Sequence, residues 1–283
     1  MAQVINTNFN SLNAQRVLTN SQSQMSTSLE RLSSGLRINR AKDDAAGLAI
    51  SQRFTAQIRG TEQANRNAND GISLLQTAEG ALDEVANMLQ RMRELTVQAV
   101  NATVGTDDRA SLNDEYNELK SEISRVFQST EFNGVNLLGT TADLDMQVGF
   151  RAGASFQITV STFDMGSRTY AGGGISFLVE RGTASGIGTI GDASDMVSKL
   201  DAAIDNISTK RADFGAKQNR LEATVRNNAN VIENQSAARS RVLDTDFARE
   251  TANLTRTQIL QQAGTAMLAQ ANSLPQNVLS LLG

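Results

Sequence analysis

The apolar residues of this chain recur mostly at the spacing of amphipathic helices. Between residues 71 and 100 they form two sets, each repeating every seven residues, with the second set displaced by three. The first set is Leu75, Leu82, Leu89 and Thr96, and the second is Ala78, Val85, Met92 and Ala99. Such a double repeat is typical of a coiled-coil seam. This stretch therefore predicts one long helix with a single buried face.

The same repeat occurs in three further stretches. One carries Leu200, Ile207, Phe214 and Leu221. The other two lie at the chain ends, and we call their repeating residues the terminal seam: Leu18, Met25, Leu29, Leu32, Leu36, Leu260, Gly264, Met267, Ala271, Leu274, Val278 and Leu281. Aromatic residues make up only 4% of the chain. Four such stretches with so few aromatic residues favour a long helical rod.

The middle of the chain has a different pattern. Eleven of the 21 glycines lie between residues 139 and 191, which argues against a continuous helix there. Apolar and polar residues alternate over residues 144–150 and again over 156–160, which predicts a β-hairpin, and residues 175–179 predict a further strand. The sequence thus predicts a mainly α fold: an elongated antiparallel helical hairpin, or coiled-coil rod, with a small β-hairpin region at its outer tip.

The chain ends and the middle are expected to form separate domains. Residues 1–43 with 240–283 are predicted to form an inner coiled coil of terminal helices. Residues 44–239 are predicted to form an outer helical rod, including the β-hairpin and glycine-rich loops at about 139–191. The apolar residues of the inner domain are too few to offset the entropy of ordering about 80 residues. We therefore expect it to be largely disordered in the free subunit and to fold when neighbouring copies cover it.

A short charged segment separates the first two helical stretches. We call it the connector, and its residues are Gly35, Arg37, Arg40, Lys42, Asp43 and Asp44. Glycine is frequent where a helix ends and aspartate where one begins, so we expect Gly35 to end the first helix and Asp43 or Asp44 to precede the second. Its cations and its two aspartates are opposite in charge and are predicted to pair within or between subunits. A solvated charged loop is the alternative.

Composition narrows the possible functions. The 283 residues include no Cys and no His, which argues against thiol or imidazole catalysis and ordinary zinc sites. "GIGTIG" at residues 186–191 resembles a dinucleotide motif but lacks the strand before it, so we interpret it as a loop before a helix starting at Asp192, with Asp195 in its first turn. We expect no enzyme, no cofactor and no metal site. A net charge of −4 and the lack of a long apolar run predict neither nucleic-acid nor membrane binding.

Four long segments resemble bacterial flagellin. They are residues 1–60 ("MAQVINTNFNSLNAQRVLTN" and onward), residues 65–101, residues 129–138 ("STEFNGVNLL") and residues 240–283 ("SRVLDTDFARETANLTRTQI" and onward). The resemblance covers nearly everything outside the glycine-rich centre. It implies a repeating subunit of the flagellar filament, which many copies of the chain build for swimming.

The resemblance also implies partners and a route of export. The chain would be secreted through the flagellar type III apparatus without a cleavable signal peptide, guarded by an export chaperone, and would end in the extracellular flagellum. Cap and hook-junction proteins would be further partners. The N-terminus agrees with this route, since it has neither the basic region nor the apolar region of a signal peptide.

Many flagellins are detected by Toll-like receptor 5 of a host. The segment "LQRMREL" and the position of Glu115 match the family's receptor-contacting pattern, which places Gln90, Arg91, Leu95 and Glu115 at the expected contact. Packing within or between subunits is the alternative role for these residues.

Two other proteins would share much of this pattern. A hook–filament junction protein would have similar terminal helices but would occur in few copies. Another coiled-coil adaptor would form a discrete oligomer, whereas a filament subunit makes contacts that do not close into a ring.

Overall fold

The computed structural model describes residues 7–162 and 186–279, the side chains of 274–279 excepted. The helices of these residues are α1 (Phe9–Ser34), α2 (Ala45–Val100), α3 (Thr106–Ser129), α5 (Ile190–Leu243) and α6 (Phe247–Leu279). Strand β1 (Glu131–Phe132) pairs with β2 (Val135–Asn136), and β3 (Asp143–Gln147) pairs with β4 (Gln157–Ser161) after the short 3-10 helix η1 (Ala154–Phe156). The predicted mainly α fold is confirmed. The strand predicted at 175–179 lies outside the described residues.

The chain divides into two compact units. The terminal unit comprises Met1–Ile58 and Glu233–Gly283, and the middle unit comprises Arg59–Ile232. Helices α2 and α5 each contribute to both units. The domain boundaries expected from the sequence, at residues 43/44 and 239/240, stay a prediction.

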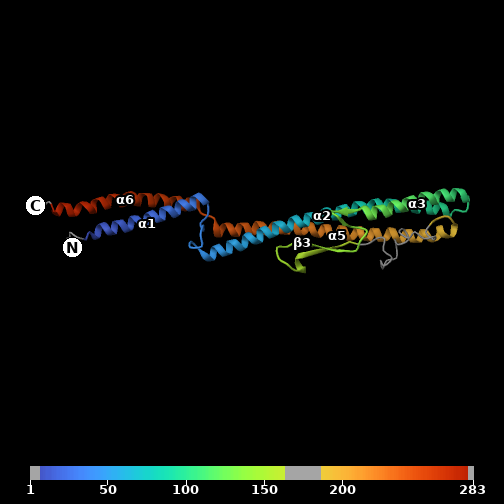
Figure 1. Ribbon diagram of the computed structural model, residues 1–283, viewed down its shortest axis with the longest axis horizontal. Helices are drawn as coiled ribbons and strands as arrows, with labels where there is room; N and C mark the ends of the chain where they lie inside the picture. The colour runs from blue at the N-terminus through green and yellow to red at the C-terminus, as the bar shows by residue number, and fades with distance from the viewer. Residues whose placement is uncertain (1–6, 163–185, 280–283) are drawn as a thin grey trace. The chain divides into compact units, whose positions relative to one another are not determined.

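The middle unit is a bundle of α2, α3 and α5, which lie side by side (Figure 1). Every residue of the two predicted seven-residue sets on α2 is buried. They pack with α5 residues Leu200, Ile207, Phe214 and Leu221 and with α3 residues Tyr116, Ile123 and Phe127. The periodic positions therefore form the core, as the sequence predicts, because large apolar side chains occupy the inward positions of all three helices.

Helix α3 folds back along α2 after a short loop at residues 101–105. Arg109 closes this loop: its Nε donates to the Ala99 carbonyl and its Nη2 to the Val104 carbonyl, both at 3.0 Å. A cation at the carboxyl end of α2 satisfies carbonyl groups that no helical N–H reaches. The turn between α2 and α3 therefore forms this end of the middle unit.

The predicted β-hairpin is present, but its expected position is wrong. Leu144 pairs with Val160 and Met146 with Ile158, as the alternation predicts. The hairpin lies against the opposite end of the middle unit from the α2–α3 turn, where Asn67 Nδ2 donates to the Gln147 carbonyl at 3.0 Å. A close approach at Gly60 allows this packing, since a Cβ there would lie 2.9 Å from the Cβ of Phe150. Periodicity alone carried no information on this long-range contact.

Two local features differ from the sequence analysis. The β1–β2 hairpin, which we did not predict, turns at Asn133 and Gly134 with φ of 52° and 78°, the conformation that an Asn-Gly turn favours. Helix α5 begins at Ile190, and its cap is Thr189, whose Oγ1 accepts from the Asp192 N–H at 3.1 Å and donates to the Asp192 carboxylate at 2.6 Å. Asp192 is therefore the third residue of the helix and not its cap, in a reciprocal capping arrangement.

Candidate functional site

The terminal unit is built on the antiparallel pair α1 and α6, which lie side by side (Figure 1). Asn8 Nδ2 donates to the Ala271 carbonyl at 2.8 Å near one end of the pair. Gln261 Nε2 donates to Gln22 Oε1 at 2.8 Å in the middle. At the other end a Cβ on Gly35 would lie 3.9 Å from Phe247 Cζ. The contacts keep one register over the length of the pair.

Small side chains occupy much of the face between α1 and α6. On α1, Ser11, Ser21 and Ser28 are buried, and Leu18, Met25 and Leu32 are half-buried. On α6, the inward positions recur every seven residues and are Glu250, Thr257, Gly264 and Ala271. Small residues let two helices approach closely, but they bury little apolar area.

Large apolar side chains are instead exposed on the outside of the pair. Their exposed fractions lie between 44% and 68%, and the residues are Phe9, Leu12, Val17, Leu29, Phe247, Ile259, Leu260 and Met267. We call this set the outer apolar surface. In the described part of the terminal unit the buried apolar residues are Ile38, Ile58 and Ala271. This distribution reverses the one in the middle unit, and exposed apolar surfaces of this kind are typical of sites of protein association.

The terminal seam is therefore split between two faces. Gly264 and Ala271 face α1, and Leu18, Met25, Leu32 and Leu36 are half-buried. Leu29, Leu260 and Met267 belong to the outer apolar surface. The side chains of Leu274, Val278 and Leu281 lie outside the described residues.

A shallow groove runs between α1 and α6 on this surface. It has a volume of about 540 Å³. Its lining is Asn10, Asn13, Ala14, Val17, Leu260, Ala263, Gly264, Met267, Gln270 and Ala271, with no charged side chain among them. Its shape and lining suit an apolar side chain or helix face from another chain.

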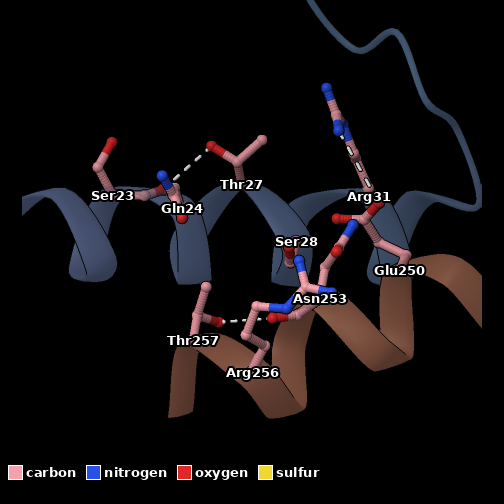
Figure 2. A pocket seen from close by; sticks show the side chains of 9 residues that line it. All are labelled: Ser23, Gln24, Thr27, Ser28, Arg31, Glu250, Asn253, Arg256 and Thr257. Carbon is pink, nitrogen blue, oxygen red and sulfur yellow. Dashed lines mark hydrogen bonds and ion pairs between the residues drawn. The ribbon is translucent and has the colours of Figure 1, made fainter. Parts of the chain in front are cut away.

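A second pocket, of about 310 Å³, is polar and lies nearer the connector (Figure 2). The Glu250 side chain is only 9% exposed there, and one of its oxygens lies 3.8 Å from Nη1 of Arg31. The Nε of Arg31 is buried and has no hydrogen-bond partner. A shift of α1 along α6 would separate these charges and leave a buried carboxylate unpaired. The pair therefore disfavours other registers of the two helices.

The connector joins the terminal helices through backbone pairing. Gly35 ends α1 in the left-handed conformation with φ of 71°, as the sequence predicts. The Arg37 N–H donates to the Leu243 carbonyl at 2.7 Å, and the Thr245 N–H donates to the Gly35 carbonyl at 3.0 Å. Arg37 Nη2 also donates to the Val242 carbonyl at 2.6 Å. The α1–α2 and α5–α6 junctions are thus held together at one place.

Within the subunit, the main partners of the connector aspartates are backbone N–H groups, and Lys42 adds a smaller electrostatic effect on Asp43; pairing between subunits stays a prediction. Asp44 caps α2, accepting from the Gly47 N–H at 2.8 Å. Asp43 accepts from the N–H groups of Arg40 and Asn39 at 2.9 and 3.2 Å, and these bonds hold its pKa below the ordinary value. The Arg40 guanidinium pairs with Glu30 at 2.8 Å. Both carboxylates thus accept hydrogen bonds from backbone N–H groups, which need acceptors in turns. The Lys42 side chain is exposed.

The four predicted receptor residues lie on α2 and α3 of the middle unit. Arg91 and Glu115 form an ion pair at 2.8 Å, and Arg91 also pairs with Glu94 at 3.1 Å. These bonds raise the pKa of Arg91, that to Glu115 most. Gln90 is exposed beside them. Leu95, by contrast, is 1% exposed, so its expected place at the contact surface is corrected to the core of the unit.

The described residues include neither a side-chain cluster that could hold a metal ion nor a helix that could cross a membrane. No group of three or more acidic side chains is placed to hold a metal ion in residues 7–162 and 186–279. Over the same ranges, no helix is both long and apolar enough to cross a membrane. The fold and the terminal unit define the class: a mainly α protein whose paired terminal helices expose large apolar side chains.

Comparison with known proteins identifies the family. Residues 5–143 match the bacterial flagellin N-terminal helical region, and residues 197–282 match the C-terminal helical region. The chain is 47% identical to flagellin of Halalkalibacterium halodurans over 280 residues, and 42% identical to the flagellar filament 33 kDa core protein of Treponema phagedenis over 291 residues; each comparison covers 99% of both chains. The chain belongs to the bacterial flagellin family.

A solved structure shares the fold at low identity. It is that of a putative flagellar hook-associated protein from Vibrio parahaemolyticus, with a TM-score of 0.58 and 12% identity, covering 71% of this chain and 100% of that one. That likeness concerns the fold alone. Membership of the flagellin family gives the chain a structural role in the extracellular bacterial flagellum, where the family forms the filament.

Proposed function

We propose that this chain polymerises into the filament through the outer apolar surface of α1 and α6. The observation that carries the proposal is the reversed distribution of side chains in the terminal unit: the fully buried α1 positions are serines, and eight large apolar side chains lie outside the pair. One subunit covers none of these large side chains by more than about half. Neighbouring copies that cover them gain the hydrophobic free energy that the isolated pair lacks.

Seeded growth tests this proposal. Purified subunits are added to short filament fragments and followed by electron microscopy. Continuous growth into long tubes supports a filament subunit. Growth that stops after a few added subunits supports the alternative of a hook–filament junction protein, which shares this fold with a filament subunit. Small closed particles support an adaptor and contradict the proposal.

The same surface explains why the chain needs an escort before assembly. Free subunits expose the eight large apolar side chains of the outer apolar surface, four on α1 and four on α6, and this exposure favours aggregation. The proposed export chaperone covers the α6 part of this surface until the chain leaves by the type III apparatus, after which cap and hook-junction proteins direct its addition. Co-purification of the full chain with its chaperone, and loss of that complex with Leu260→Asp, tests this step.

We further propose that Toll-like receptor 5 of a host contacts the α2–α3 surface around Arg91. Gln90, Arg91 and Glu115 supply exposed polar groups there, whereas Leu95 is buried in the core and packs on the inner side of α2. The test is a receptor-reporter assay with Arg91→Ala. The matched control is Arg125→Ala, which also removes an exposed arginine of an ion pair, that with Glu122. Equal signalling by both variants and the unaltered chain contradicts this contact.

A further inference from the structure

Met267 differs from the other methionines whose side chains the structure describes. It is 65% exposed on α6. Met92 and Met196 are buried in the middle unit, and Met25, Met88 and Met146 are half-buried. Oxidation of a thioether requires contact between its sulfur and the oxidant, so exposure controls which methionine reacts first. Where α1 and α6 are paired, Met267 is therefore the most exposed to an oxidant of the six methionines whose side chains the structure describes.

The location of Met267 gives this reactivity a consequence. Its side chain lines the groove between α1 and α6, beside Leu260, Gly264 and Ala271. None of the residues lining that groove is charged, so the surroundings of the thioether are uncharged. The groove belongs to the outer apolar surface, which neighbouring copies cover in the proposed filament.

We propose that Met267 is an oxidation site that switches the subunit between assembly-competent and assembly-incompetent forms. The inference rests on the proposed function. The oxidant class is a hydroperoxide. The sulfur lone pair attacks the terminal peroxide oxygen, an S–O bond forms and the O–O bond breaks. The hydroxyl proton passes to the departing oxygen, so methionine sulfoxide and an alcohol, or water from hydrogen peroxide, are the products. Sulfur loses two electrons, which the peroxide gains.

The sulfoxide changes the chemistry of the covered surface. A flexible apolar side chain becomes polar and acquires a strong hydrogen-bond acceptor. A neighbouring copy that covers the groove buries this oxygen among mostly aliphatic side chains, which weakens association. Reduction of the sulfoxide restores the thioether, so the change is reversible. In a finished filament the sulfur is covered and is protected from the oxidant.

The experiment compares subunits before and after treatment with hydrogen peroxide. Mass spectrometry of peptides gives the oxidised fraction at each methionine, and sedimentation of seeded reactions gives the critical concentration for elongation. For the unaltered chain we expect Met267 to be oxidised before the five other methionines whose side chains the structure describes, and the critical concentration to rise at least about fivefold. Treatment of assembled filaments at the same dose should leave Met267 reduced.

Two variants and a reversal complete the test, each judged by its ratio of treated to untreated critical concentrations. Met267→Leu should give a ratio near one, and Met196→Leu, which removes a buried methionine, should give the ratio of the unaltered chain. Methionine sulfoxide reductases should return the oxidised unaltered chain to its starting value. An unchanged critical concentration after complete oxidation of Met267 overturns the inference. Failure of untreated subunits to elongate seeds instead overturns the proposed function.

Discussion

Replacement of Leu260 by aspartate tests the outer apolar surface directly. Leu260 is 44% exposed in the subunit, so about half of its transfer free energy, about 1 kcal/mol, remains to be gained on assembly. An ionised carboxylate at this position costs several kcal/mol when a neighbour buries it without a partner. Arg256 lies one helical turn before it and offsets only about 0.3–0.5 kcal/mol of this cost. The total loss is therefore at least about 4 kcal/mol, which raises the critical concentration by about a thousandfold.

The assay is seeded elongation followed by sedimentation, with circular dichroism to verify that the variant subunit keeps its helix content. Leu260→Asn is the matched control, because it is similar in shape to the aspartate variant and uncharged. We expect its critical concentration to lie between those of the unaltered chain and of Leu260→Asp, and the difference between the two variants isolates the buried charge. A critical concentration for Leu260→Asp within about threefold of the unaltered value would refute the assignment of this face to the subunit contact.

Three further measurements test other parts of the structure. Amide exchange on the free subunit should be fast in α1 and α6 and slow in the central part of α2; equal protection would show that the terminal unit needs no neighbours. Gly60→Ala should lower the free energy of unfolding by about 1–2 kcal/mol, because its Cβ would press on Phe150, whereas Gly80→Ala, with nothing within 4 Å of its Cβ, should be neutral or stabilising. The pKa of Asp43 is lower in the folded chain than the ordinary value of 3.8, so its contribution to stability is present above that value and is lost as pH falls through the lower, folded one; the protection of the Arg40 N–H, measured relative to its intrinsic exchange rate at each pH, should therefore fall on acidification, and Asp43→Asn should reduce this pH dependence.

Much of the middle unit was predictable from local patterns. The seven-residue repeats on α2 and α5 placed their core residues correctly, because inward positions hold large apolar residues throughout. The alternation of Leu144 and Met146 fixed their strand, since its period of two differs from that of a helix. The Thr189–Asp192 cap and the Asn133–Gly134 turn were missed, although both carry recognised local signals.

Other features depended on contacts between distant parts of the chain. Nothing local to Gly60 or to Phe150 indicates that they meet, so the hairpin was placed at the wrong end of the middle unit. Leu95 was assigned to a receptor contact by motif, but it follows Met92 by three residues and precedes Ala99 by four. That spacing puts all three on the buried face of α2, so periodicity favoured burial.

The terminal helices show why a repeat of seven does not by itself establish a self-sufficient helix pair. The two units share this repeat, but they fill it differently. On α2, Leu75, Leu82 and Leu89 occupy inward positions and bury enough area for the middle unit to have its own core. On α1, Ser21 and Ser28 occupy such positions, and comparable leucines lie outside. Spacing sets which residues share a face, whereas their size sets whether that face can be completed within one chain. The serines between α1 and α6 thus support the same proposal as the leucines on their outside, that another copy supplies the second half of the hydrophobic contact.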